Sequence, residues 1–260
     1  MITSNSNERI KAVVRLETDR SIRHSEGLYV AEGEKMFSEA PKDHIKSVFI
    51  SENYLQKCSK EIARKLDITG YETVSDSVFL KISDTKTPQG ILCVLKQQYA
   101  DITKETKSER DSIRILITER IQDPGNLGTM IRTAEGAGFD LLITDDKTVD
   151  IYNPKVIRAT MGSIFRMKIA VSQDLKDTIT RLKSAGITVY AAHLKGKNSY
   201  RDEKYGKKLA FLIGNEGNGL SDEISGMADK LIRIPMEGKV ESLNASVAAA
   251  LLMYESKEER

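Results

Sequence analysis

Polar side chains that can bind and orient a substrate recur in three segments, each of which follows or contains an apolar run. The segments are residues 121–140 (IQDPGNLGTMIRTAEGAGFD), 212–223 (LIGNEGNGLSDE) and 234–255 (IPMEGKVESLNASVAAALLMYE). They offer amide, guanidinium, carboxylate and hydroxyl groups, which can hold a reacting group through directed hydrogen bonds. The candidate catalytic residues are Asn126, Arg132, Glu216, Ser242 and Asn244.

Covalent and metal chemistry are poorly supported by the remaining residues. Of the three histidines, only His193 lies near the three segments in sequence, so a Ser-His nucleophile pair is not indicated. The cysteines, Cys58 and Cys93, are far apart and do not have the spacing of metal ligands. We therefore expect no metal, and chemistry that depends on binding and orientation.

The glycine-rich turn of the second segment, residues 214–219 (GNEGNG), lets the backbone approach a ligand closely. No Gly-Lys-Ser/Thr follows, so it is not a P-loop, and its glycine spacing is not that of a dinucleotide fingerprint. Each segment also has a purely structural interpretation. Asn126 stands where a helix N-cap is expected, Ser221 can cap a short helix, and Ser242 or Asn244 can cap the last helix.

The elements around these segments alternate between strand and helix from residue 113 onward. Several strands are continuous apolar runs, as expected when both faces of a parallel sheet are covered. The alternation predicts an α/β domain over 113–260 with a mostly parallel sheet and ligand-binding loops beyond the carboxyl ends of its strands. The expected strands are residues 113–118, 140–144, 166–172, 187–192, 208–214 and 230–236.

The first part of the chain predicts a separate, small α/β domain over residues 1–97. A helix is expected over 7–19, a second over 52–66, and strands over 28–33, 47–51 and 90–95. Residues 98–112 are polar and lack a hydrophobic period, so we expect a linker there.

Composition sets further limits on function. The 260 residues include 40% hydrophobic residues, two cysteines and no tryptophan, with a net charge of +2. Because few cysteines are typical of reduced compartments and no signal sequence is visible, we expect a cytoplasmic protein. No run reaches the roughly 18 apolar residues that a membrane helix needs, so no membrane association is expected.

Taken together and in this order, the three segments resemble the SpoU/TrmH family of RNA ribose methyltransferases, within the SPOUT superfamily. The matching residues are NLGTMIRTAEGAG (126–138), GNEGNGL (214–220) and IPMEGKVESLNASVAAA (234–250). The first domain resembles the family's substrate-binding module through RSIRHSEGLYVAEG (20–33). The resemblance implies S-adenosylmethionine-dependent methylation of a ribose 2′-hydroxyl, in ribosomal rather than transfer RNA, by a homodimer whose C-terminal region forms a deep trefoil knot.

The resemblance also assigns roles to residues. Arg132 is implied to activate the hydroxyl; because a guanidinium stays protonated, we interpret it as gripping a nearby phosphate. Asn126 would orient Arg132 or the ribose, and Glu216 would fix its loop or the arginine. Ser242 and Asn244 would bind the cofactor or hydroxyl and hold the last loop. The implied cofactor-binding residues are Ala192, His193, Gly214, Glu216, Ile234, Met236 and Leu243.

Basic residues cluster in three places, which are either solvated faces or phosphate contacts. One is the loop 195–208, one surrounds Lys155, and one precedes the glycine turn of the first domain. The candidate RNA-binding residues are Arg15, Arg20, Arg23, Lys155, Arg158, Lys195 and Lys197.

Two other functional classes remain as alternatives. A catalytically inactive RNA-binding protein of the same fold predicts damaged motifs, whereas all five candidate catalytic residues are present. A nucleotide-dependent oxidoreductase predicts a glycine fingerprint after an early strand, and the sequence has none.

Overall fold

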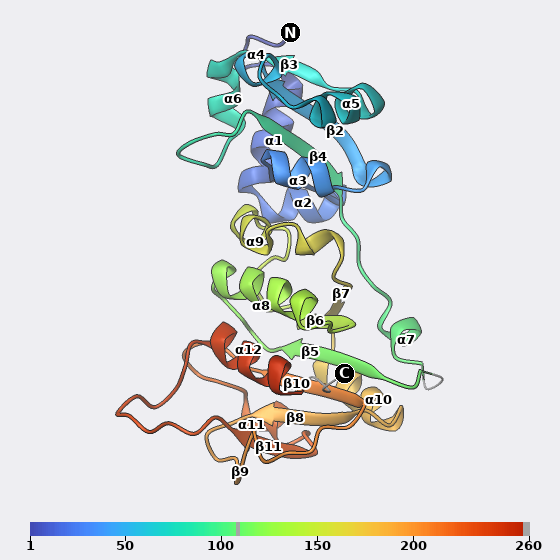
Figure 1. Ribbon diagram of the computed structural model, residues 1–260, viewed down its shortest axis with the longest axis vertical. Coiled ribbons are helices and arrows are strands. Elements are labelled where there is room, and N and C mark those ends of the chain that lie inside the picture. Colours follow the sequence, from blue (N-terminus) through green and yellow to red (C-terminus); the bar gives the residue numbers. More distant parts are fainter. Residues whose placement is uncertain (108–109, 257–260) are drawn as a thin grey trace. The chain divides into compact units, whose positions relative to one another are not determined.

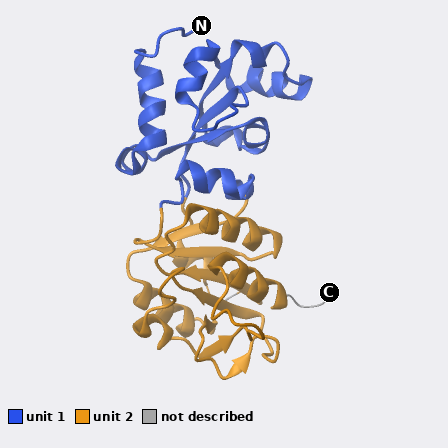
Figure 2. Ribbon diagram, turned by 90° about the vertical axis from the view of Figure 1, so that its left-hand side faces the viewer, with its two compact units in different colours: residues 1–98, 150–165 blue, residues 99–149, 166–260 orange. Residues whose placement is uncertain are grey.

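The computed structural model describes residues 1–107 and 110–256. The chain divides into two compact units (Figure 2): Met1–Gln98 with Asp150–Phe165, and Tyr99–Val149 with the chain from Arg166 onward. The division after residue 98 lies next to the expected one. Residues 150–165, however, belong to the first unit and not to the C-terminal one, because Tyr152 packs on Tyr29 with ring centroids 4.5 Å apart.

The first unit is built on a four-stranded sheet in the order β1-β4-β2-β3. The strands are β1 (Leu28–Glu32), β2 (Ile45–Ser51), β3 (Glu72–Val74) and β4 (Ile91–Lys96). β4 is antiparallel to both β1 and β2, and β2 is parallel to β3. Helices complete the layer: α1 (Glu8–Thr18), α2 (Arg20–Glu26), α3 (Glu34–Glu39), α4 (Glu52–Leu55), α5 (Lys60–Thr69), α6 (Asp76–Ile82) and α9 (Pro154–Thr160), with the short 3₁₀ turns η1 (Lys42–His44) and η2 (Ser163–Phe165).

Serine caps explain the main local difference from expectation in this unit. The single helix expected over 52–66 is two helices: Ser51 caps the start of α4 at the amide of Tyr54, and Ser59, inside the expected helix, begins α5 by capping the amide of Ile62. The first helix forms as expected, with Asn7 as its N-cap.

The second unit contains a seven-stranded sheet in the order β7-β6-β5-β10-β8-β11-β9. Every neighbouring pair is parallel, which confirms the expected mostly parallel α/β sheet. The strands are β5 (Ile113–Thr118), β6 (Leu141–Asp145), β7 (Ile169–Ser172), β8 (Thr188–Ala192), β9 (Asn198–Ser199), β10 (Lys208–Ile213) and β11 (Lys230–Arg233). The two-residue β9 was not expected, since it lies in a basic loop and is too short to show a period.

Helices cover both faces of this sheet. α10 (Leu175–Ser184) and α11 (Asp222–Ser225) share one apolar cluster with the strands. α8 (Pro124–Gly136) and α12 (Ala245–Glu255) pack against each other, and α12 also contacts β10 (Figure 1). α7 (Ile102–Glu105) lies in the stretch expected to be a linker, where Asp101 caps it and Ile102 packs on the core.

The parallel sheet brings several of its loops together at one edge. β5, β8, β10 and β11 are parallel, so the loops that follow them leave the same edge of the sheet. Those loops contain the polar segments described above. Across the described ranges, 1–107 and 110–256, there is no helix with the length and apolar character needed to cross a membrane.

Candidate functional site

A cavity of about 380 Å³ opens among the loops at this edge of the sheet. The loops after β8, β10 and β11 contribute to its wall, as does the start of α12. Its lining combines apolar side chains with a few polar groups, which is typical of small-molecule sites. All seven candidate cofactor-binding residues line it: Ala192, His193, Gly214, Glu216, Ile234, Met236 and Leu243. Ser242 and Lys195 line it as well.

The glycine-rich turn forms one wall of the cavity and is folded tightly. A Cβ on Gly214 would lie 2.1 Å from the carbonyl carbon of Gly219 and from the amide nitrogen of Leu220, which no real side chain could do. Asn215 and Gly219 exchange backbone hydrogen bonds of 3.1 and 2.9 Å. The turn therefore requires glycine at 214 for close backbone packing, not for an unusual φ angle.

Three of the five candidate catalytic residues form one hydrogen-bonded chain. Asn244 donates from Nδ2 to Oδ1 of Asn126 at 2.8 Å, and Asn126 donates from Nδ2 to Oε1 of Glu216 at 3.0 Å. The direction of the chain is fixed at the Asn244 end, because Oδ1 of Asn244 accepts from the amide and hydroxyl of Ser246. These residues come from three segments and meet at one place.

The Glu216 carboxylate is held by further donors. Its oxygens also accept from the backbone amides of Gln122 (3.1 Å) and Asp123 (3.0 Å). Partial burial alone would raise the pKa of Glu216, but hydrogen bonds from Asn126 and from backbone amides together lower the pKa below its ordinary value. Glu216 is thus kept as an anion that fixes the start of α8.

Asp123, not Asn126, is the N-cap of α8, which corrects the expectation. Its Oδ1 accepts from the amide of Asn126 at 2.7 Å, and Pro124 follows in the first turn. The Asp-Pro pair is a known start signal that identifies the cap from sequence. The amide side chain of Asn126 is thereby released from capping and is available to link Glu216 and Asn244.

A second carboxylate, which the sequence analysis did not single out, supports the same loops. Glu119 is 4% exposed and accepts from both the amide and the hydroxyl of Ser221 at 2.8 Å. Ser221 caps α11, as expected. One residue further along, the carbonyl of Arg120 accepts from Nδ2 of Asn215 at 2.8 Å. The segment after β5 is therefore bonded to the glycine-rich turn along its length.

Arg132 lies outside this network. It is exposed on α8, and the structure gives it no hydrogen bond or ion pair with any residue in the described part of the chain. It does not line the cavity, and it contacts neither Asn126 nor Glu216 by a hydrogen bond. Within one chain neither Asn126 nor Glu216 bonds to Arg132; the alternative roles, in which Asn126 orients the ribose and Glu216 fixes its loop, stay predictions.

The prediction that Arg23 contacts RNA is corrected by its environment in the structure. Its side chain is 3% exposed; Nη1 donates to the carbonyls of Leu16 (2.6 Å) and Glu17 (3.1 Å), and Nε pairs with Asp150 at 2.7 Å. A guanidinium that is buried and bonded through Nε and Nη1 inside the unit is not accessible to a phosphate. The sequence could not show this, because Asp150 lies 127 residues away.

The other candidate RNA contacts are on the surface of their units. Arg158 is half-buried and pairs with Asp84 at 2.9 Å. The remaining five are exposed: Arg15, Arg20, Lys155, Lys195 and Lys197.

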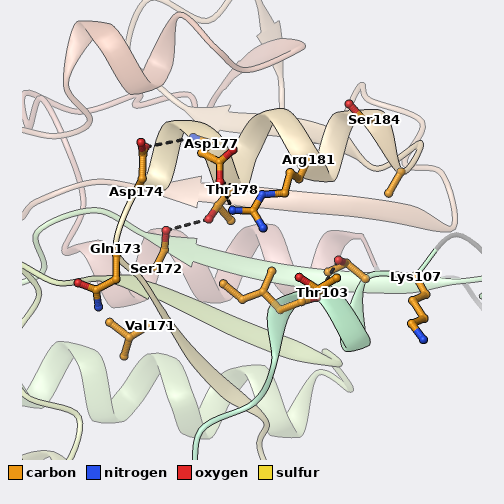
Figure 3. Close-up of a pocket in the computed structure, with 13 residues that line it drawn as sticks. Thr103, Lys107, Val171, Ser172, Gln173, Asp174, Asp177, Thr178, Arg181 and Ser184 are labelled. Atoms are coloured by element: carbon orange, nitrogen blue, oxygen red, sulfur yellow. Dashed lines mark hydrogen bonds and ion pairs between the residues drawn. The ribbon is translucent and has the colours of Figure 1, made fainter.

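A larger cavity of about 760 Å³ lies elsewhere in the second unit, between α7 and α10 (Figure 3). Several of its polar groups already have partners in the protein: Ser172 and Thr178 share a 2.8 Å hydrogen bond, and Asp174 caps α10. It contains none of the candidate site residues, so size alone does not make it the functional site. No group of three or more possible metal ligands is found within residues 1–107 and 110–256.

The fold and the site define a class of protein, and comparison with known families agrees. The profile of the SpoU rRNA Methylase family matches residues 113–254, and that of the MRM3-like substrate binding domain matches residues 7–93. The chain belongs to the SpoU rRNA methylase family, which confirms the resemblance drawn from the three segments.

Individual relatives cover nearly the whole chain. The 23S rRNA (guanosine(2553)-2′-O)-methyltransferase RlmP of Bacillus subtilis is 33% identical over 97% of this chain and 97% of its own length. A crystal structure of an AdoMet-bound rRNA methyltransferase from Sinorhizobium meliloti superposes with a TM-score of 0.86 at 31% identity, covering 98% of this chain and 96% of that one. A structure of an RNA 2′-O ribose methyltransferase gives a TM-score of 0.82 at 26% identity, covering 98% and 97%.

Proposed function

We propose that this chain methylates the ribose 2′-hydroxyl of one nucleotide in ribosomal RNA, at the edge of the sheet where Asn126, Glu216 and Asn244 meet. The class of reaction follows from the family and from a relative matched over nearly its whole length: the chain is an S-adenosylmethionine-dependent RNA methyltransferase. The observation that carries the proposal is the hydrogen-bonded chain of these three residues, which shares Glu216 with the cavity.

The cavity suits S-adenosylmethionine in size and lining. Apolar side chains (Ile234, Met236 and Leu243) would contact the adenosine, and the turn beginning at Gly214 presents backbone rather than side chains. The cofactor supplies an electrophilic methyl group bound to a sulfonium. His193 can contribute a directed hydrogen bond, because its Nδ1 accepts from the amide of Lys195 at 3.1 Å, which leaves Nε2 as the donor.

In this proposal the hydrogen-bonded residues Asn126, Glu216 and Asn244 position the loops of the site, and Arg132 binds the substrate RNA. Asn126 and Glu216 hold the start of α8, and Asn244 fixes the start of α12. Ser242, exposed at the cavity, can hydrogen-bond the cofactor or the ribose. Arg132, protonated and without a partner in the described chain, is suited to grip a phosphate next to the target ribose and to lower the pKa of the 2′-hydroxyl electrostatically.

We propose in addition that the C-terminal region forms the trefoil knot implied by the family. The support lies in the order of strands. The chain runs from β8 through β9 and then returns to β10. In the sheet, the later strand β11 lies between β8 and β9 and pairs with both. After β11 the chain comes back to pack α12 on α8 and β10. The connection from β8 to β10 therefore has parts on both sides of β11. A knot requires this arrangement, in which a later segment of the chain passes through an earlier loop.

A homodimer is the proposed active form. The outer face of α12 exposes Val247 (47%) and Tyr254 (53%), and it borders a shallow hollow of about 460 Å³ that includes Thr129 of α8. Exposed apolar side chains grouped on one surface mark an association site. Arg132 lies one helical turn beyond Thr129, so association through this surface would bring Arg132 close to the second copy.

Substrate RNA would be bound by exposed basic residues, Arg15, Arg20 and Lys155 on the first unit and Lys195 and Lys197 on the second. The proposed location is the cytoplasm, consistent with two free cysteines. The inactive RNA-binding alternative is not favoured, since every motif residue is intact and three of them are already assembled.

The test of the proposal is substitution of Arg132 in a methyl-transfer assay with ribosomal RNA. If the guanidinium binds a phosphate in a forked geometry, Arg132→Lys keeps the charge but loses the second hydrogen bond, and turnover should fall at least tenfold. Cofactor affinity, measured by calorimetry, should not change. Near-normal turnover of Arg132→Lys would contradict the forked contact, and no methyl transfer by the unmodified protein would contradict the function.

A further inference from the structure

Arg120, the second residue after β5, has a backbone conformation that residues with side chains rarely adopt. Its φ is +55°, in the left-handed region, where only Met161 joins it among the non-glycine residues of 1–107 and 110–256. A Cβ is disfavoured there, and glycine, asparagine or aspartate would occupy the position at lower cost. Such outliers concentrate at functional sites.

The conformation is imposed by the site itself. The amide of Arg120 donates to Oδ1 of Asp145 at 3.0 Å, and its carbonyl accepts from Asn215 at 2.8 Å. These bonds tie the residue to the loop after β6 and to the glycine-rich turn. The backbone explains why a left-handed residue is needed here, but it does not explain why that residue is an arginine.

The charges around the site give the reason. Residues 119–123, which precede α8, and residues 214–223 meet at Glu216, and Arg120 is the only cation in these two segments; the next cation along the chain is Arg132 on α8. Their acidic residues are Glu119, Asp123, Glu216, Asp222 and Glu223. An RNA backbone approaching this rim would meet mainly negative charge, which opposes binding of a polyanion. The Arg120 guanidinium, 4.0 Å from Glu119, offsets part of that repulsion.

The guanidinium is available for this task. The side chain is 52% exposed, and its nearest carboxylate oxygen, Oε1 of Glu119, is 4.0 Å from Nε. Both carboxylate oxygens of Glu119 already accept hydrogen bonds from Ser221. The donors of Arg120 are therefore not used up by Glu119 and can face a ligand.

We propose that Arg120 binds a phosphate of the substrate RNA at the rim of the catalytic site, and that the strained backbone is retained for that contact. The inference rests on the proposed function and adds a substrate contact to it. A guanidinium is suited to a phosphate because its planar fork can donate two parallel hydrogen bonds.

The proposal predicts opposite effects on stability and on RNA binding. Arg120→Gly relieves the strain and should raise Tm by about 2–4 °C. The same variant should bind unmethylated 23S ribosomal RNA transcript three- to tenfold more weakly, and the slope of log Kd against log salt should fall by about 1. Arg120→Lys should lie between wild type and Arg120→Gly in RNA affinity, and its Tm should equal that of wild type.

Met161→Gly is the matched control for strain alone, because Met161 has a φ of +51° and carries no charge. It should raise Tm similarly and leave RNA affinity unchanged. The inference is overturned if Arg120→Gly binds the transcript like wild type, or if it weakens cofactor affinity equally, which would indicate a structural role. If the wild-type protein binds RNA through Arg120 but transfers no methyl group, the proposed function fails while the contact stands.

Discussion

Nδ2 of Asn244 donates a 2.8 Å hydrogen bond to Oδ1 of Asn126 and so joins the cap of α12 to the first turn of α8, across 118 residues of sequence. Asn126 extends the connection to Glu216 on the glycine-rich turn. Because each amide can donate only from its nitrogen, fixing Asn244 fixes Asn126 in turn. The three loops around the cavity therefore behave as one unit, and disturbing one residue should be felt by the others.

The substitution Asn244→Ser should keep the N-cap of α12 but remove the hydrogen bond to Asn126. Serine caps helices about as well as asparagine, so the stability of α12 should be retained. A serine hydroxyl is too short to replace the amide that reaches Asn126, so methyl transfer should fall tenfold or more. Thermal melting and a transfer assay measure the two effects. Asn244→Ala, which removes the cap as well, should lose about 1 kcal/mol of unfolding free energy; full activity of Asn244→Ser would show that the contact is dispensable.

Gly214→Ala should abolish cofactor binding. The added methyl group would lie 2.1 Å from backbone atoms of Gly219 and Leu220, and backbone cannot move aside as a side chain can. We expect a loss of at least 2 kcal/mol in unfolding free energy, typical of overpacking, and no heat of binding with S-adenosylmethionine. Gly206→Ala is the control, because Gly206 lies outside the cavity and an added Cβ would have no neighbour within 4 Å. Cofactor binding by Gly214→Ala at wild-type affinity would rule out this packing.

Glu216 should contribute stability that depends on pH. Because its folded pKa is below the ordinary value of 4.5, the contribution is present above that value and is lost as pH falls through the folded pKa. The difference in Tm between wild type and Glu216→Gln should thus be largest near neutral pH and shrink as the solution is acidified below about 4.5. Glu237, which has no hydrogen-bond partner in the described chain, provides the control substitution Glu237→Gln. A difference in Tm that stays constant with pH would mean that the carboxylate charge is not what the network holds.

Arg23 should contribute to the stability of the folded protein and not to RNA binding. Lysine cannot make all three of its buried contacts, so Arg23→Lys should lower the free energy of unfolding by about 2 kcal/mol. The exposed Arg15→Lys should stay within about 0.5 kcal/mol of wild type. Urea unfolding followed by circular dichroism measures both. If Arg23→Lys were as stable as wild type and bound RNA more weakly, the original assignment of Arg23 as an RNA contact would be restored.

The parts of this structure that sequence predicts are those encoded by local pattern. The apolar runs of β5, β6 and β10 identified a parallel sheet, and the order of three motifs identified the family and grouped Asn126, Glu216 and Asn244. Pattern also identified Ser221 as a cap, whose partner lies within a turn, and offered Asn244 as one of two caps for the last helix.

The parts that sequence did not predict depend on distant partners or on very short elements. Arg23 looked like a surface base until Asp150 supplied its counter-charge. Glu119 gave no signal because its role is to bond Ser221, 102 residues away. The packing of α9 on the first unit and the two-residue β9 likewise arise from tertiary contacts that no local period encodes.

The most direct test of the central claim uses S-adenosylmethionine carrying a tritiated methyl group, with unmethylated ribosomal RNA as acceptor. After digestion to nucleosides, the label should be found in a single 2′-O-methylnucleoside, and Asn126→Ala should reduce incorporation at least a hundredfold without unfolding the protein. Label in a methylated base, or equal incorporation by Asn126→Ala, would contradict the assignment of this network to ribose methylation.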